Sequence, residues 1–302
     1  MKVVILGGGE SGVGAAILAK TKGLEVFLSD KGEIKENYKK VLVENGIEFE
    51  EKNHDEERIL AADWVIKSPG VPKKAEMVQK IKAKGIRLSS EIEFGAEFTN
   101  AKIIAITGSN GKTTTTSLIY HILKNDNLNV GLGGNIGKSF AMQVAQENFD
   151  YYVLEVSSFQ LDDIQNFRPY ISLLLNLSPD HLDQYNYNYE EYALAKFRIA
   201  ENQENDNYFI YNKDDEMSQK LLQELDLRVK QIPFSMKEKL EEGGFTEEEK
   251  IVVKLHDEFS MKIEDLSLMG THNVANSLAA SIAGKLLNIS NESIRNSLMT
   301  FQ

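Results

Sequence analysis

Apolar residues follow two different spacings along the N-terminal part of the chain. Short β-branched runs at residues 2–7, 25–30 and 64–67 alternate with stretches of helical spacing at residues 13–23 and 75–85. The runs predict buried strands and the stretches between them predict helices. Strands that alternate with helices favour a parallel sheet with right-handed crossovers. We therefore expect a Rossmann-like α/β domain at the N-terminus.

A second series of apolar runs begins after residue 100. It predicts the strands of one larger sheet, at residues 103–107, 129–134, 151–158, 170–177 and 207–212. The segment at residues 89–100 leads from the first series to the second. We therefore place a domain boundary near residue 92, with one domain at residues 1–91 and another at residues 92–302.

The pattern changes again after residue 227. Apolar and polar residues alternate at residues 251–257 and 259–265, which predicts short antiparallel strands in a hairpin insert or at a sheet edge. Helical spacing returns at residues 272–287 and 290–301. The Asn- and Tyr-rich segment from Tyr185 to Tyr192 is interpreted as a surface loop.

Composition and charge exclude several kinds of protein. The net charge of -12 and the pI near 5.1, without a Lys/Arg-rich block, argue against nucleic-acid and anionic-membrane partners. The chain has no cysteine, which excludes disulfides, thiolate metal sites and cysteine nucleophiles. No signal-peptide pattern or apolar stretch of transmembrane length is present. We expect a soluble, cytoplasmic monomer that does not insert into a membrane.

The first glycine-rich turn is Gly7-x-Gly9-x-x-Gly12, between a predicted strand and a helix, and Asp30 ends the next strand. This is the spacing of a dinucleotide-binding fingerprint, in which a diphosphate faces a helix N-terminus. NAD(P), another nucleotide diphosphate, or a turn needed only for packing all fit the pattern. A second turn at residues 68–71 follows another strand. Both turns are expected to face one crevice, because ligands of open α/β sheets lie at the carboxyl ends of strands.

The most informative motif is a glycine-rich turn that runs into a helix opened by a lysine and threonines, at Gly108, Ser109, Asn110, Gly111, Lys112, Thr113 and Thr114. N–H groups, a helix N-terminus and an ammonium in this order predict a cradle for the phosphates of ATP. Ile106, however, stands where a standard Walker A motif has its first glycine. Lys112 would neutralise phosphoryl oxygens, and Thr113 or Thr114 would offer a hydroxyl to Mg²⁺. The alternative is a Gly-Lys turn without a ligand.

These patterns together predict an α/β fold. A Rossmann-like parallel sheet domain is followed by a larger P-loop ATPase-like α/β domain with a small antiparallel β portion.

Three further residues are candidates for a metal site. Glu155 ends a predicted strand, where a carboxylate either contacts Mg²⁺ beside the phosphate loop or is merely solvated. His181 follows the run at residues 170–177, but imidazole is not the preferred partner of a hard cation, so an exposed loop histidine fits equally well. Lys196 lies on a predicted helix, where a surface lysine is the default. An ammonium cannot ligate a metal unless its charge is changed.

Asn273 and Asn276 lie one turn apart at the start of the helix at residues 272–287. Their amides are suited to reading the edge of a nucleotide base. Capping of this helix by Thr271 or Asn273 accounts for the same residues.

The segments TGSNGKTT, GGNIG, LEVSSFQL, PDHLD, AKFRI and GTHNVAN occur in this order, and together they resemble the cytoplasmic Mur ligases of peptidoglycan synthesis. The resemblance covers nearly the whole chain. GGGESGVG, the SPGVP turn and the SSFQL segment after Glu155 are most similar to the branch that adds D-glutamate to UDP-N-acetylmuramoyl-L-alanine.

The resemblance implies a role for each candidate residue. The first domain would hold the UDP part of the substrate, through Glu10, Ser11, Asp30, Ser68 and Gly70. The muramoyl part or its phosphates would contact Asn135, Ser157 and Gln160. ATP would be held by Gly108 to Thr114, with Asn273 and Asn276 at the nucleotide. The catalytic residues would be Lys112, Glu155, His181 and Lys196. Thr113 and Glu155 would bind one Mg²⁺, and His181 a second with Lys196 as a carbamate.

The implied activity is ATP-dependent amide ligation. The alanyl carboxylate would attack the γ-phosphate of ATP, and the amine of D-glutamate would displace phosphate from the resulting acyl phosphate. Family members carry a third, C-terminal domain, which would supply the D-glutamate site. The chain ends near the expected linker, so we expect a truncated form that binds the UDP-linked substrate with little or no turnover.

Three other interpretations of the sequence are possible. The first alternative is another Mur ligase of the same pathway. A nicotinamide-dependent oxidoreductase would use the turn at Gly7 to Gly12, but it leaves the phosphate loop and Glu155 without a role. A non-catalytic nucleotide switch would bind ATP and would give no role to a UDP-sugar.

Overall fold

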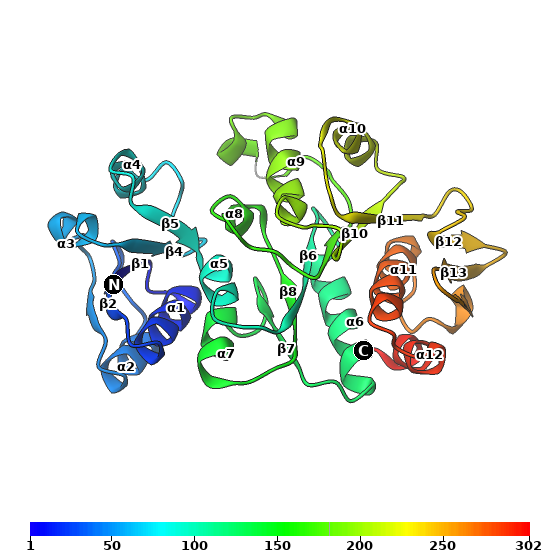
Figure 1. Cartoon of the computed structure of the whole chain (residues 1–302), viewed down its shortest axis with the longest axis horizontal. Coiled ribbons are helices and arrows are strands. Elements are labelled where there is room, and N and C mark those ends of the chain that lie inside the picture. Colours follow the sequence, from blue (N-terminus) through cyan, green and yellow to red (C-terminus); the bar gives the residue numbers. More distant parts are fainter. Residues whose placement is uncertain (181) are drawn as a thin grey trace. The chain divides into compact units, whose positions relative to one another are not determined.

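The computed structural model describes residues 1–180 and 182–302, and its contacts form two compact units (Figure 1). The first unit comprises residues 1–100, 137–148 and 159–167. The second comprises residues 101–136, 149–158 and 168–302. This division differs from the sequence-based boundary near residue 92, because helix α5 (Glu91–Ala96) packs against α1 (Glu10–Thr21) and α7 (Phe140–Gln146) of the first unit. The extents of the functional domains at residues 1–91 and 92–302 stay a prediction.

Over the described residues, the first unit contains a five-stranded parallel sheet in the order β3-β2-β1-β4-β5. Its strands are β1 (Lys2–Leu6), β2 (Glu25–Ser29), β3 (Glu48–Glu50), β4 (Trp64–Lys67) and β5 (Arg87–Ser90). Its other helices are α2 (Glu36–Glu44), α3 (Glu56–Leu60) and α4 (Glu76–Ala83). The predicted Rossmann-like parallel sheet is confirmed.

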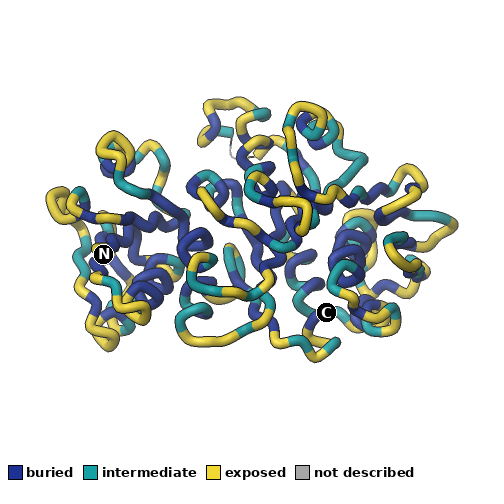
Figure 2. The backbone as a smooth tube through the Cα atoms, in the orientation of Figure 1, coloured by how far each residue is buried: buried dark blue, intermediate teal, exposed yellow. Residues whose placement is uncertain are grey.

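Both faces of this first sheet are buried, which explains its continuous apolar runs (Figure 2). Val3 and Ile5 of β1 belong to the core on the α1 side. Val4 and Leu6 belong to the core that includes Val78 of α4. Successive side chains of a strand point to opposite faces, so one strand contributes to both cores.

Buried charged groups anchor the segment at residues 159–167 to the first unit. Nζ of Lys67 lies 3.1 Å from Oδ2 of Asp163, and both side chains are at most 3% exposed. The Glu93 carboxylate accepts hydrogen bonds from the backbone N–H groups of Gln165, Asn166 and Phe167, at 2.8–3.2 Å. These contacts satisfy buried charges that would otherwise be costly.

The second unit contains, over the described residues, a nine-stranded sheet in the order β14-β13-β12-β11-β10-β9-β6-β8-β7. Its strands are β6 (Lys102–Thr107), β7 (Val130–Gly134), β8 (Tyr151–Glu155), β9 (Ile171–Leu174), β10 (Tyr208–Asn212), β11 (Lys230–Ser235), β12 (Gly243–Glu247), β13 (Lys250–Lys254) and β14 (Glu258–Lys262). Pairing is parallel from β7 through β12 and antiparallel from β12 to β14. The predicted larger sheet and its small antiparallel portion are confirmed.

Helices of the second unit lie on both sides of its sheet (Figure 1). The long helix α6 (Lys112–Asn125) packs against α11 (Thr271–Leu286) and α12 (Asn291–Thr300), whereas α9 (Tyr189–Phe197) and α10 (Glu216–Glu224) lie on the other side. Shorter helices of this unit are η1 (Leu182–Tyr185), η2 (Arg198–Ala200) and η3 (Ile263–Asp265), whereas α8 (Ser158–Leu161) lies, except for its first residue, in the first unit. In the described part of the chain, none of the helices has the length and apolar character needed to cross a membrane.

The buried pair of Lys67 and Asp163 leads to a stability prediction. Lys67→Met should lower the free energy of unfolding by about 3–5 kcal/mol, because it leaves the Asp163 carboxylate buried without its cation. The double variant Lys67→Met/Asp163→Leu should recover most of this loss, since it removes both charges. Urea unfolding followed by circular dichroism measures both effects. A single variant within 1 kcal/mol of the parent chain would contradict the prediction.

Candidate active site

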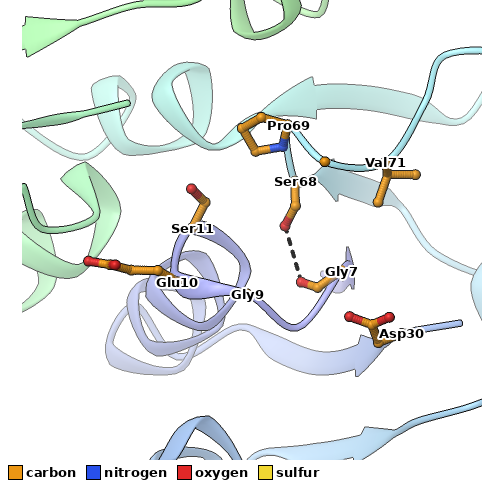
Figure 3. A pocket seen from close by; sticks show the side chains of 9 residues that line it. Gly7, Gly9, Glu10, Ser11, Asp30, Ser68, Pro69 and Val71 are labelled. Atoms are coloured by element: carbon orange, nitrogen blue, oxygen red, sulfur yellow. Dashed lines mark hydrogen bonds between the residues drawn. The ribbon is translucent and has the colours of Figure 1, made fainter. Parts of the chain in front are cut away.

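The two glycine turns of the first unit line one pocket with a volume of about 430 Å³ (Figure 3). Its lining residues are Gly7, Gly9, Glu10, Ser11, Asp30, Ser68, Pro69, Gly70 and Val71. The expectation that both turns face the same crevice is confirmed. Five of the residues predicted for the UDP part of a substrate, namely Glu10, Ser11, Asp30, Ser68 and Gly70, therefore lie together.

Backbone geometry fixes the shape of this pocket. Gly7 has φ +98°, and a Cβ atom there would lie 2.9 Å from Cβ of Ser68, so only glycine fits. The Ser68 hydroxyl donates a hydrogen bond to the Gly7 carbonyl at 3.1 Å (Figure 3). Helix α1 begins at Glu10 without a side-chain cap, so its first N–H groups are left for a ligand. Uncapped N–H groups at a helix N-terminus favour an anion.

Asp30 accepts hydrogen bonds from the backbone N–H groups of Gly8 at 2.5 Å and Gly32 at 2.7 Å. The carboxylate is therefore held in place at the end of β2, as the dinucleotide fingerprint predicts. Its position at the pocket leaves it suited to accept from a ribose or a base.

The Glu10 side chain points away from Gly7 and Asp30 (Figure 3). Its Oε1 accepts a hydrogen bond from the backbone N–H of Ser139 at 3.1 Å. The Ser139 hydroxyl in turn donates to Oε1 of Glu91 at 2.6 Å. Glu91 is only 1% exposed, and burial raises its pKa to about 7. Sequence reasoning missed Glu91 and Ser139, because nothing in a linear pattern places α7 beside α1.

The phosphate loop lies between β6 and α6 in the second unit. The Lys112 ammonium donates to the carbonyls of Gly108 at 2.8 Å and Ser109 at 2.9 Å. The Lys196 ammonium donates to the same Gly108 carbonyl at 2.9 Å. Burial lowers the pKa of Lys112, while the nearby carboxylates of Glu155 and Asp180 act in the opposite direction. Two ammonium groups therefore converge on this loop.

Lys196 is buried, with 2% of its surface exposed, so the default interpretation as a surface lysine is wrong. It lies on α9, and its Nζ is 4.8 Å from the centre of the Tyr192 ring. Burial of an ammonium is costly unless specific partners compensate it, which makes a structural or chemical role necessary.

Glu155 joins three elements at the edge of the second sheet. Thr113 donates its hydroxyl to Oε2 of Glu155 at 2.7 Å, and the Asn135 amide donates to Oε1 at 2.8 Å. The strand register explains this meeting, because Glu155 pairs with Ile106 of β6 and with Gly134 of β7. The alternative that the Glu155 carboxylate is merely solvated at the end of its strand is therefore wrong.

A Mg²⁺ ion would fit the oxygen donors at Thr113 and Glu155. No group of three His, Asp or Glu side chains gathers as a metal site among the described residues. Mg²⁺ does not require one, because it keeps several waters and takes few protein ligands. His181 lies outside the described residues, so its predicted metal role stays a prediction.

The start of α11 lies against the phosphate loop. A Cβ atom at Gly111, which has φ +81°, would lie 2.6 Å from Oδ1 of Asn276. Asn273 donates its amide to the Met269 carbonyl at 2.9 Å. The helix is capped by Gly270 without a side-chain hydrogen bond, so capping by Thr271 or Asn273 is wrong. The nucleotide roles of Asn273 and Asn276 stay a prediction.

Three residues that fasten the phosphate loop were missed by sequence reasoning. Asn176 accepts from the N–H of Asn110 and donates to its carbonyl, both at 2.9 Å. Ser109 exchanges two hydrogen bonds with the backbone of Ser178, and its hydroxyl lies 3.2 Å from that of Tyr192. Tyr192 is buried on α9, which begins at Tyr189, and Tyr185 is buried as well, so the surface loop expected from Tyr185 to Tyr192 is wrong at both ends. The sequence gives only a weak indication of these contacts, because they depend on the pairing of β9 with β6.

The remaining predicted substrate residues do not line the glycine-turn pocket. Asn135 is bound to Glu155, Ser157 follows β8 and is partly exposed, and Gln160 on α8 is buried. Their predicted contacts with the muramoyl part stay predictions.

The fold and the site define a nucleotide-binding α/β protein with a phosphate loop. Residues 106–284 match the model of the Mur ligase middle domain, and residues 2–77 match that of the MurD N-terminal domain. The whole chain is 52% identical to a UDP-N-acetylmuramoylalanine–D-glutamate ligase of Christiangramia forsetii and covers 68% of that protein. A ligase of the same name from Bacteroides fragilis is 50% identical, again over 68% of its length. The chain therefore belongs to the Mur ligase family.

Solved structures share the same fold. The UDP-N-acetylmuramate:L-alanyl-gamma-D-glutamyl-meso-diaminopimelate ligase from Neisseria meningitides superposes with a TM-score of 0.69 at 20% identity, over 100% of this chain and 98% of that chain. A UDP-N-acetylmuramate-alanine ligase from Thermotoga maritima has a TM-score of 0.59 at 21% identity, over 68% of its chain. These similarities support the arrangement of the sheets and helices.

The contacts of Asn176 predict a change in ATP affinity. Asn176→Ala should raise the Kd for ATP about ten-fold, because the loop at Asn110 loses both side-chain hydrogen bonds that hold it. Isothermal titration measures the Kd. The matched control is Asn205→Ala, at an exposed turn residue, which should leave the Kd unchanged. Equal affinities of the Asn176 variant and the parent chain would contradict the prediction.

The buried Glu91 predicts a pH dependence of stability. Its pKa is raised from 4.5 in the unfolded chain to about 7, so its contribution is fully present below pH 4.5 and is lost as pH rises through about 7. From pH 4.5 to pH 8 this loss should reach roughly 2–3 kcal/mol. Chemical unfolding of the parent chain and of Glu91→Gln at each pH isolates the effect. Identical pH profiles for the two proteins would contradict it.

Proposed function

We propose that this chain carries the UDP-substrate site and the ATP site of a UDP-N-acetylmuramoyl-L-alanine:D-glutamate ligase that works in the cytoplasm. The close relatives have this named activity, and the family's use of ATP agrees with the phosphate loop. The observation that carries the proposal is the meeting of Thr113, Asn135 and Glu155 beside Lys112 and Lys196. A nicotinamide-dependent oxidoreductase would have no use for this arrangement.

The glycine-turn pocket would bind the UDP part of the substrate. The uncapped start of α1 would face the diphosphate through N–H groups near Glu10 and Ser11, and Asp30 would accept from the uridine. Ser68 and Gly70 would close the opposite side of the pocket. Asn135, Ser157 and Gln160 would contact the muramoyl part or its phosphates.

The phosphate loop would bind ATP. N–H groups from Gly108 to Thr114 would surround the phosphates, and Lys112 would leave the carbonyls of Gly108 and Ser109 to contact transferring phosphoryl oxygens. Asn273 and Asn276 would contact the nucleotide at the start of α11.

One Mg²⁺ would be held by Thr113 and Glu155, and a second by His181 with a carbamylated Lys196; the ions would supply neutralisation of phosphoryl charge. Carbamylation replaces the Lys196 ammonium with an anionic oxygen group, which resolves the charge objection to a lysine ligand. One N–H would remain on Nζ, so the hydrogen bond to the Gly108 carbonyl is compatible with the modification.

The reaction would proceed in two steps. A carboxylate oxygen of the alanyl group attacks the γ-phosphorus, and the bond between this phosphorus and the bridging β-phosphate oxygen breaks. ADP departs, and an acyl phosphate is formed. The amine of D-glutamate then attacks the acyl carbon, and inorganic phosphate departs as the amide forms. Lys112 and the loop N–H groups would stabilise the charge that develops on the phosphoryl oxygens.

Titration with UDP-N-acetylmuramoyl-L-alanine tests the proposal. The folded chain should bind this ligand more tightly than its dipeptide homologue, because the latter is the substrate of a sister ligase. Asp30→Ala should weaken the UDP ligand at least ten-fold and leave ATP binding unchanged, whereas Lys112→Ala should do the reverse. The two variants are matched controls for each other, because they lie in different units.

Failure of a folded sample to bind either UDP-linked ligand would overturn the proposal. Tighter binding of the dipeptide homologue would favour another Mur ligase of the pathway. Saturable binding of NADH without any response to UDP would favour the oxidoreductase.

A further inference from the structure

A row of three polar groups leads from the glycine-turn pocket into the core of the first unit. Glu10 lies at the pocket and accepts from the Ser139 N–H at 3.1 Å. Ser139, at the start of α7, donates its hydroxyl to Glu91 at 2.6 Å. The N–H of Ala141 donates to the same Oε1 of Glu91 at 2.7 Å. A single serine therefore connects a carboxylate at the pocket with a buried one.

Glu91 has a place for a proton. Its Oε1 receives the hydrogen bonds of Ser139 and Ala141, and the backbone N–H of Phe140 also favours the ionised carboxylate, whereas its buried Oε2 has no hydrogen-bond partner among the described residues. A proton on Oε2 would leave the contacts with Ser139 and Ala141 intact. An ionised Glu91 instead leaves a buried anionic oxygen unsatisfied, which is unfavourable.

Charged groups on the elements around α5 do not neutralise Glu91. On β4, Lys67 pairs with Asp163, and on β5, Arg87 pairs with Glu97. Glu93 of α5 itself is bound to backbone N–H groups of residues 165–167, and α7 carries no charged side chain. Lys138 precedes α7 and is exposed. The facing charge is the carboxylate of Glu10 on α1, which acts against ionisation of Glu91.

Among the described residues, the lining of the pocket offers no cation to a ligand. Its lining residues include the carboxylates of Glu10 and Asp30 and contain neither lysine nor arginine. A nucleoside diphosphate ester brings two more negative charges to this place. Like charges at short range favour protonation of the group that is least well solvated. Glu10 is exposed, so water stabilises its charge, whereas Glu91 is buried.

We propose that Glu91 is a positioning residue that couples ligand binding to a proton: a diphosphate ligand enters beside Glu10, and Glu91 takes up one proton on Oε2. The inference rests on the proposed function of this pocket as the UDP site. Ser139 keeps its hydrogen bonds to both carboxylates throughout. The raised pKa of Glu91 agrees with it, because a group that titrates near neutrality takes up a proton readily.

Calorimetry of the parent chain tests the coupling. Titration with UDP-N-acetylmuramoyl-L-alanine at pH 7.5, in buffers of different ionisation enthalpy, should reveal uptake of a substantial fraction of a proton per ligand. The affinity should fall as pH rises above 7, by up to ten-fold per pH unit, because the bound form requires the proton. UMP, which carries about one negative charge fewer than UDP at this pH, should cause less uptake than UDP.

The variant Glu91→Gln should bind the same ligand without proton uptake and with a flat pH profile, because the amide oxygen can still accept from Ser139. The variant Glu10→Gln should retain uptake of smaller size. If Glu91→Gln does not fold, the comparison of UDP with UMP on the parent chain decides the matter. Equal uptake for the two nucleotides would then overturn the coupling.

The titrations distinguish a missing proton coupling at Glu91 from a missing UDP site. Binding of the UDP ligand without proton uptake would overturn the role of Glu91 and leave the UDP site in place. Undiminished uptake by Glu91→Gln would also overturn it. Absence of any binding of UDP-linked ligands by the folded chain would overturn both.

Discussion

The carboxylate of Glu155 is the contact on which the arrangement of the second unit's site depends. It binds Thr113 at the start of α6 and Asn135 after β7. Because β7, β8 and β6 are adjacent and parallel, their carboxyl ends meet at one edge of the sheet. The phosphate loop, the acidic residue and the amide therefore come together without any long-range adjustment of the backbone.

The first unit handles negative charge differently. Two of its buried carboxylates have partners. Glu93 accepts hydrogen bonds from backbone N–H groups of residues 165–167, and Asp163 pairs with Lys67. Glu91 is the exception, since its buried Oε2 has no hydrogen-bond partner and no ion pair with a cation among the described residues, whereas Oδ2 of Asp163 lies 3.1 Å from the Lys67 ammonium. These contacts attach the segment at residues 159–167 to the N-terminal sheet, and α7 packs against α1, the helix that begins at the pocket.

Much of the fold could be predicted from the sequence because each motif depends on residues that are close together in the chain. The glycines at Gly7 and Gly111 adopt positive φ, and the runs of β1 and β6 are buried on both faces. Burial of Lys196 and the contacts of Asn176 were not readable, since they depend on the neighbours that β9 and α9 find in space. The helix start at Gly270 shows the same limit, because two plausible capping residues were present and neither caps.

The amino-acid sequence alone determined the α/β class, the order of the strands' motifs and the residue types for a phosphate loop and a nucleotide-diphosphate turn. Periodicity and glycine spacing are properties of residues that are close together in the chain, so they can be recognised in the sequence alone. Only the tertiary structure decided that Ser139 bridges Glu10 and Glu91, and that Glu155 is shared by Thr113 and Asn135. Such hydrogen bonds join residues far apart in sequence, and their existence depends on helix packing and strand order.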